Sequence, residues 1–213
     1  KTDTLTLQWG AINKSMNPHI ANTLARHPDT LRVPLNEPRL MVVGLKGYIG
    51  GYELIASPGE CITITGRIIY DRTGKKPEAI FRKMKAKGSQ WQSTYARVVR
   101  DYIYHLDSLD TDMDQDYKGI KKIIFWAKQK NDEQAIADMY QTRDGQAYIT
   151  RVTSNFNDRN DYLRILIERH KDSFLGPMLM LRFGEGLNPQ QQPLYDSLSE
   201  TAKQSYYGRE VKD

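Results

Sequence analysis

The chain has 213 residues, of which 39% are hydrophobic, and its 13 Tyr and 3 Trp are bulky candidates for a core. This length is enough for one large domain or two small ones without stabilising disulfides, and the large apolar side chains argue against disorder. The net charge is +5, and no apolar run approaches the length of about 20 residues that a membrane-spanning helix needs. We therefore expect a soluble, globular chain.

The first 70 residues have the pattern of short β-strands. Thr4–Trp9 and Cys61–Thr65 alternate polar and apolar side chains, so that Ile62 and Ile64 share one face, and alternation with period two is typical of a half-buried strand. The segment Asn13–His27, which contains a proline, fits no element clearly. Between these segments lie apolar runs separated by turn residues, and we expect them to be strands: Leu31–Leu35, Leu40–Tyr48 and Tyr52–Ile55.

Basic residues gather between Arg67 and Lys87. This window holds eight Lys and Arg against Asp71 and Glu78, so its net charge is +6. Such a window could contact phosphates or an anionic membrane surface. Charge runs usually form solvated surfaces, and the simpler interpretation is a solvated connector between two subdomains.

From residue 77 onward the apolar residues recur at spacings of three and four, which predicts helices up to the C-terminal end. The first stripe runs from Tyr95 to Leu109, and Ser89 with Gln92 has the pattern of a capping box at its start. Asn131 with Gln134 could cap a later helix. Further helical segments are expected over Ile120–Ala127, Tyr148–Leu166 with a polar break at Ser154–Asn160, Phe174–Phe183, Asn188–Leu198 and Thr201–Val211.

These patterns predict an α+β fold. We expect an N-terminal antiparallel, β-sandwich-like domain over residues 1–70 and an all-helical domain over residues 71–213. The change of period near residue 70 is the reason for this boundary.

Five aspartates between Asp107 and Asp116 raise the question of a calcium site. An EF-hand loop needs Gly at its sixth position and Glu at its twelfth, and neither the frame starting at Asp110 nor the frame starting at Asp112 supplies them. We expect these carboxylates to end one helix and to favour the positive N-terminus of the next.

No other residue pattern indicates chemistry. Cys61 is the one cysteine of the sequence, so it can form neither an internal disulfide nor a Cys-x-x-Cys pair, and we expect an inert, partly buried thiol. The glycines of Gly44–Gly51 lack the spacing of a nucleotide-binding loop and indicate a strand bend. The histidines show no metal-binding spacing, and a structural role is expected for each: His19, His27, His105 and His170. We therefore expect no catalytic, cofactor-binding or metal-binding residue, and no nucleic-acid partner.

Three segments resemble one protein family. Gly50–Gly66, GGYELIASPGECITITG, resembles the segment yelilePGDsitvtG of an N-terminal domain of unknown function in envelope proteins of Gram-negative gut-type bacteria. HKDSFLGPMLML, which starts at His170, is similar to that family's hPdSyvaalll. Leu194–Val211, LYDSLSETAKQSYYGREV, is similar to its lYdsLspevkkSyyGkkv. Glu60 and Cys61 depart from the family, which has Asp and then a small polar residue there.

In that family the domain precedes a thioredoxin-like thiol–disulfide oxidoreductase domain. The resemblance therefore implies an exported protein of the periplasm or cell envelope, attached to a membrane only through a lipid anchor outside this chain. The redox dithiol would lie beyond Asp213, so no catalytic residue is carried over to this chain. Tyr206 and Tyr207, near the end of the last matching segment, are the candidate interdomain contacts, because aromatic rings with a polar tip suit half-wet interfaces. The alternative is that both rings pack on the preceding helices.

The function expected from these observations is a non-catalytic accessory module that positions the thioredoxin-like domain. The alternative is a free-standing periplasmic or surface protein that binds a peptide or a glycan. A third alternative is an enzyme of unrecognised type, against which the lack of a paired nucleophile and base argues. A Cys-x-x-Cys encoded downstream of Asp213 would favour the accessory module. A stop codon there would favour the free-standing binding protein.

Overall fold

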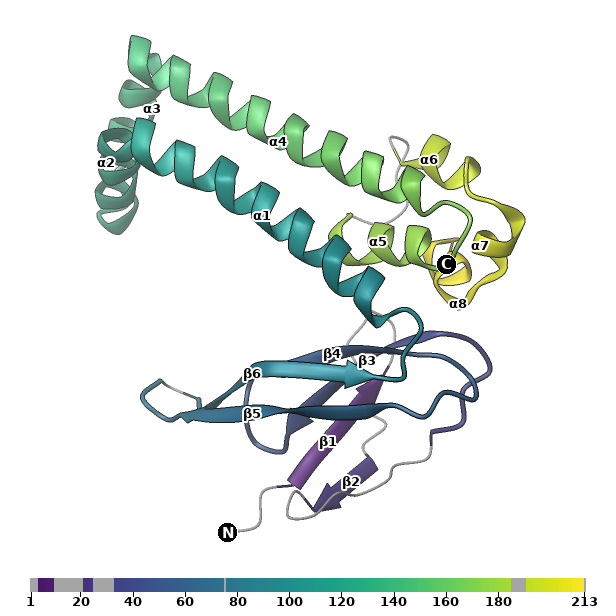
Figure 1. Cartoon of the computed structure of the whole chain (residues 1–213). Helices are drawn as coiled ribbons and strands as arrows, with labels where there is room; N and C mark the ends of the chain where they lie inside the picture. The colour runs from purple at the N-terminus through teal and green to yellow at the C-terminus, as the bar shows by residue number, and fades with distance from the viewer. Residues whose placement is uncertain (1–3, 10–20, 25–32, 75, 185–190, 213) are drawn as a thin grey trace. The chain divides into compact units, whose positions relative to one another are not determined.

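The computed structural model describes residues 4–9, 21–24, 33–74, 76–184 and 191–212 (Figure 1). Strands occupy the N-terminal part and helices the remainder, so the expected α+β class is confirmed. The strands are β1 (Thr4–Trp9), β2 (Ala21–Leu24), β3 (Arg39–Leu45), β4 (Gly51–Ala56), β5 (Thr63–Asp71) and β6 (Glu78–Lys87). The helices are α1 (Gln92–Asp116), α2 (Lys118–Gln129), α3 (Glu133–Gln141), α4 (Arg143–Arg169), α5 (Leu175–Phe183), α6 (Gln192–Asp196), α7 (Glu200–Gln204) and α8 (Tyr206–Lys212).

The strands form two antiparallel sheets, one of four strands in the order β2-β1-β3-β4 and one of two strands, β5-β6. The glycine cluster serves the turn between β3 and β4, where Gly47 and Gly50 have φ of 84° and 96°, a region that glycine enters without steric cost. A Cβ at Gly50 would lie 2.5 Å from the carbonyl oxygen of Ala79. The glycines therefore form a turn between two strands instead of the expected bend within one strand, and Gly50 is required there.

The hairpin β5-β6 packs on the larger sheet. Ile64 and Ala86 of the hairpin lie against the buried side chains of Met41 and Leu54. The backbone of Ile49, in the turn after β3, connects the two sheets by donating to Pro77 O at 2.9 Å. Because the second sheet has only two strands, the expected β-sandwich is not established by this arrangement.

The basic window is a hairpin and not a connector. The first five residues of the window, up to Asp71, lie in β5, and its last ten, Glu78–Lys87, are β6. The expectation that all residues from 77 onward are helical is therefore wrong for β6, and helix begins only at Gln92.

A β-bulge interrupts the regular pairing of the hairpin. Arg67 pairs with Arg82, but Thr65 pairs with Lys85, so β6 has one extra residue between these pairs. Lys83, in this interval, has a φ of 53°. The extra residue shifts the apolar alternation of β6 by one position, so that Phe81 and Met84 are three residues apart.

The helical part also differs from expectation in detail. α4 runs unbroken through the polar segment Ser154–Asn160, because most of these side chains are exposed. The buried exception is Asn155, whose Nδ2 donates to the carbonyl oxygen of Leu109 on α1 at 3.2 Å. Asp132, rather than Asn131, caps α3 by accepting from Ala135 N at 3.0 Å.

The aspartate run lies at the C-terminal end of α1, which ends at Asp116 before α2 begins. Only Asp116 ends the helix, whereas the other four aspartates lie within α1 and the first turn of α2 has no acidic residue, so the expectation that these carboxylates end one helix and favour the N-terminus of the next is not confirmed. Asp110 forms an ion pair with Arg159 of α4, and Asp114 forms one with Lys121 of α2. These carboxylates thus have cationic side chains as partners.

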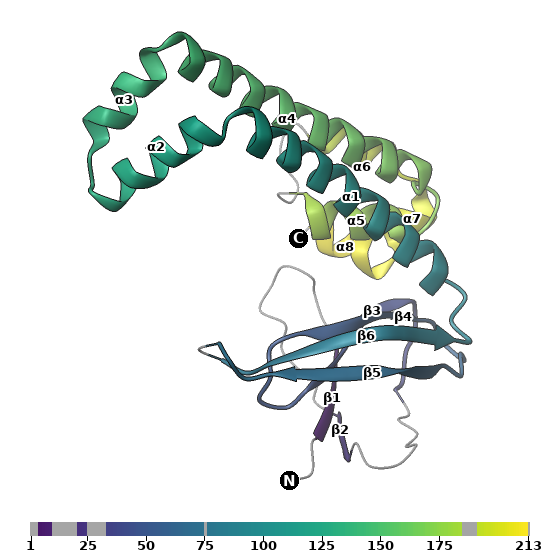
Figure 2. The same cartoon turned by 60° about the vertical axis from the view of Figure 1, so that its left-hand side comes forward.

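The chain separates into two compact units, and these are not the predicted segments 1–70 and 71–213. Unit 1 combines Lys1–Arg97 with Ile167–Asp213, and unit 2 is Val98–Leu166. Unit 1 therefore holds the sheets, the start of α1 and the helices α5 to α8. In unit 2, α1 and α4 lie side by side and antiparallel, with α2 and α3 connecting them, as Figure 2 shows from a second direction.

Candidate functional site

The two tyrosines singled out from the sequence lie at the start of α8, in unit 1. Tyr207 is 0% exposed, and its hydroxyl accepts a hydrogen bond from the backbone N–H of Leu40 on β3 at 2.5 Å. Its ring lies 6.2 Å from that of Phe174, centroid to centroid. Burial raises the pKa of the Tyr207 phenol, so the hydroxyl stays protonated. Tyr207 is therefore part of the core of unit 1.

Tyr206 is half-buried and contacts the chain that leads into β3. The guanidinium carbon of Arg39 lies 3.1 Å from the centre of the Tyr206 ring, a cation–π arrangement. The Tyr206 N–H donates to Glu37 Oε2 at 2.5 Å, and Arg209 Nη2 donates to Glu37 Oε1 at 2.5 Å. Both oxygens of the Glu37 carboxylate are thus occupied by groups of α8.

The start of α1 is bonded to the edge strand β4. Ser89 Oγ accepts from Gln92 N at 3.1 Å, as the capping pattern predicted. Gln92 does not complete the capping box: its Oε1 accepts from Ile55 N at 2.7 Å, and its Nε2 donates to Glu53 O at 3.0 Å. The Gln92 side chain therefore satisfies backbone groups at the open edge of β4, which would otherwise cost free energy if buried unpaired.

A polar cluster links β4, α1 and α5. The Tyr95 hydroxyl donates to Glu53 Oε2 at 2.6 Å, and Arg182 Nη1 lies 2.6 Å from Glu53 Oε1. Tyr95 is 2% exposed, and burial first, then the Glu53 carboxylate, raise its pKa. With both carboxylate oxygens occupied, Glu53 is arranged to hold the elements together rather than to accept a proton from a substrate.

The remaining residues singled out from the sequence are dispersed. Cys61 is exposed, so the expectation of a partly buried thiol is wrong, because the residue precedes β5 instead of lying within it. His105 stacks on Tyr162, with 4.3 Å between ring centroids. Burial, followed by Arg97, lowers the pKa of His170, so this side chain favours its neutral form. His19 and His27 lie outside the described residues, and within the described ranges no three His, Cys, Asp or Glu side chains converge on a metal site.

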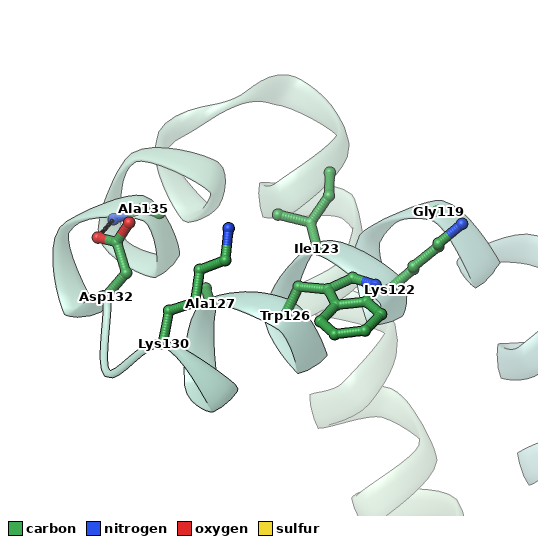
Figure 3. A pocket seen from close by; sticks show the side chains of 8 residues that line it. All are labelled: Gly119, Lys122, Ile123, Trp126, Ala127, Lys130, Asp132 and Ala135. Carbon is green, nitrogen blue, oxygen red and sulfur yellow. Dashed lines mark hydrogen bonds between the residues drawn. The ribbon is translucent and has the colours of Figure 1, made fainter.

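One surface was missed by the sequence analysis. A groove of about 340 Å³ in unit 2 lies along α2 and the first turn of α3, and Figure 3 shows Trp126 and Ile123 on its wall. The sequence of α2 combines lysines with Ile, Phe and Trp, a composition that indicates a basic and aromatic surface. The prediction of the helix rested only on its buried apolar residues. The lining residues are Gly119, Lys122, Ile123, Trp126, Ala127, Lys130, Asp132 and Ala135.

None of the helices over the described ranges has the length and apolar character to cross a membrane. No protein-family model matches the chain, and neither a curated protein nor a solved structure matches it.

Proposed function

We propose that this chain is a non-catalytic accessory module that positions a C-terminal thioredoxin-like domain in an exported, envelope-associated thiol–disulfide oxidoreductase. The resemblance of three segments to such N-terminal domains motivates the proposal. The structural observation that supports it most strongly is the attachment of α8 to β3 through Tyr207 and Leu40. A domain that follows α8 would leave unit 1 from an anchored helix rather than from a frayed end.

The two tyrosines take different roles in this proposal. Tyr207 anchors the exit of the chain from inside unit 1, since its ring has no exposed surface. Tyr206 is half-buried beside Arg39, and its accessible part is the proposed contact for the following domain. In this proposal α8 is attached to the larger sheet. The proposal includes a sandwich-like arrangement, in which the hairpin β5-β6 covers that sheet.

The test uses the natural full-length protein, including whatever is encoded after Asp213. Residual dipolar couplings measured for unit 1 and for the following domain report whether the two share one alignment tensor. We expect a shared tensor in the wild type. Glu37→Ala removes the carboxylate that holds Tyr206 N–H and Arg209, and we expect it to reduce the alignment of the following domain relative to unit 1.

Asp110→Ala is the matched control, because it removes a comparable ion pair, with Arg159, in unit 2. It should leave the shared tensor unchanged. Independent tensors in the wild type would contradict positioning by an anchored helix. A reading frame that ends without a Cys-x-x-Cys would also contradict it, and would favour the binding-protein alternative.

A further inference from the structure

α2 has a second apolar surface besides the one that it buries. Its buried side chains are Ile124 and Ala127. Ile123, Phe125 and Trp126 are 51%, 55% and 53% exposed. Three large apolar side chains exposed within four consecutive residues are more than scattered surface hydrophobics, and such clusters typically mark interaction sites.

The same helix is strongly basic. Between Lys118 and Asn131 the sequence has five lysines and no acidic residue. Lys121 pairs with Asp114, and over the part of the chain that the structure describes the other four lysines have no carboxylate at ion-pair distance. They are Lys118, Lys122, Lys128 and Lys130, and each of them is exposed.

The lysines and the indole follow one stripe of the helix. Lys122 and Lys130 are four residues before and after Trp126, so all three lie on the same side of α2. They line the groove together (Figure 3). Phe125 lies about 100° further around the helix, and its ring meets that of Trp126 edge to face at 5.3 Å. The exposed apolar surface therefore curves around the helix between cationic side chains.

We propose that α2 binds the surface of an anionic lipid bilayer. Its lysines would contact lipid phosphates, and Trp126 and Phe125 would enter the headgroup region, where aromatic rings with apolar bodies are favoured. Exposed lysines on flexible apolar stems can bury the stem while the ammonium stays at the phosphate level. The contact is independent of the proposed positioning function and would bring unit 2 to a membrane without a spanning segment.

Charge and shape favour a bilayer over the other occupants. A second copy would bring two helices with the same excess of lysine together, and like charges repel. An acidic partner helix seated in the groove would cover Ile123 and Trp126, which line it, but not Phe125, which lies outside that lining. Phe125 and Trp126 are adjacent in the sequence and so point in different directions, which suits a fluid surface better than a rigid helix.

The test is co-sedimentation of the whole chain with vesicles of equal parts phosphatidylcholine and phosphatidylglycerol at low ionic strength. We expect binding to these vesicles and none to pure phosphatidylcholine. Lys122→Gln/Lys128→Gln/Lys130→Gln should weaken the partition coefficient on the order of 100-fold, since each lysine near an anionic surface contributes roughly fivefold. Trp126→Ala should weaken binding and abolish the blue shift of tryptophan emission that vesicles cause. Circular dichroism verifies that both variants fold.

The matched control removes three exposed lysines from the β5-β6 hairpin, as Lys76→Gln/Lys85→Gln/Lys87→Gln. It should retain most of the binding. Equal losses in the two triple variants would contradict the proposal, because binding would then follow net charge alone. Full vesicle binding by Trp126→Ala would contradict insertion of the ring. Failure to bind the anionic vesicles, with tight binding to poly-glutamate instead, would assign the surface to an acidic polypeptide and refute the bilayer.

Discussion

The hydroxyl of Tyr207 accepts a hydrogen bond from the backbone N–H of Leu40, although 167 residues separate the two in sequence. This contact joins a seven-residue helix near the C-terminal end to the second residue of β3. Leu40 is 3% exposed and Tyr207 0%, so water cannot replace either partner. The contact therefore forms only when both β3 and α8 are folded.

Replacing Tyr207 by Phe should lower the free energy of unfolding by about 1–3 kcal/mol, because it leaves the Leu40 N–H buried without an acceptor. Tyr206→Phe is the matched control and should change it by less than about 0.5 kcal/mol, since its ring is half-buried at the surface. Urea unfolding measures both. Equal losses would contradict the assignment of Tyr207 as the anchor.

Tyr95 should make unit 1 sensitive to high pH. Its pKa is raised above the ordinary value of 10.0 by burial, so the folded state keeps a proton that the unfolded state loses above about pH 10. The stabilisation is therefore complete below that pH and decreases above it, by about 1.4 kcal/mol per pH unit for this group.

Tyr95→Phe isolates this effect, because all lysines titrate alike in both proteins. The variant should lose stability less steeply than the wild type above about pH 10, as followed by urea unfolding at a series of pH values. Parallel curves for the two proteins would show that Tyr95 ionises as readily when folded as when unfolded.

The bulge in β6 predicts that glycine substitutions at two nearby lysines have different effects on stability. Lys83 has a φ of 53°, which costs an L-residue about 1–2 kcal/mol, so Lys83→Gly should leave the protein as stable or about 1 kcal/mol more stable. Lys85→Gly, two residues on in the regular ladder, should lower the free energy of unfolding by roughly 0.5–1 kcal/mol. Thermal unfolding compares the two, and a larger loss at Lys83 would contradict the register.

Cys61 should react with a thiol reagent in the folded protein without denaturant, because it is exposed. Cys61→Ser should change the stability by less than about 0.5 kcal/mol. Since one thiol cannot complete a dithiol cycle, this chain should not reduce insulin. Turnover that disappears with Cys61→Ser would contradict a non-catalytic chain.

Much of the fold follows from local patterns. The alternation of Thr4–Trp9 and the helical stripe that starts at Tyr95 each predict the element that forms. The hairpin was missed because its many Lys and Arg residues were taken for a solvated connector, although the exposed faces of two paired strands accommodate them. In α4, polar residues on an exposed face were taken for a break, although solvent accommodates them within one continuous helix.

The contacts that define unit 1 could not be predicted in this way. Glu37 with Arg209 and Glu53 with Arg182 connect segments far apart in the sequence, and no local period encodes such pairs. The tyrosines at the start of α8 were identified as important, but their partners were not. The basic and aromatic surface of α2 was visible in its composition and was overlooked because its buried stripe alone explained the helix.

The central claim is that α8 is anchored to the sheet, and native-state hydrogen exchange tests it most directly. The amides of Tyr206–Lys212 should be protected as strongly as those of Arg39–Leu45 in β3, and Tyr207→Ala should remove protection from the helix first. A short helix near a chain end normally frays. If the α8 amides exchange as fast as those of an unstructured peptide while β3 stays protected, the helix is not anchored and the proposed positioning role fails with it.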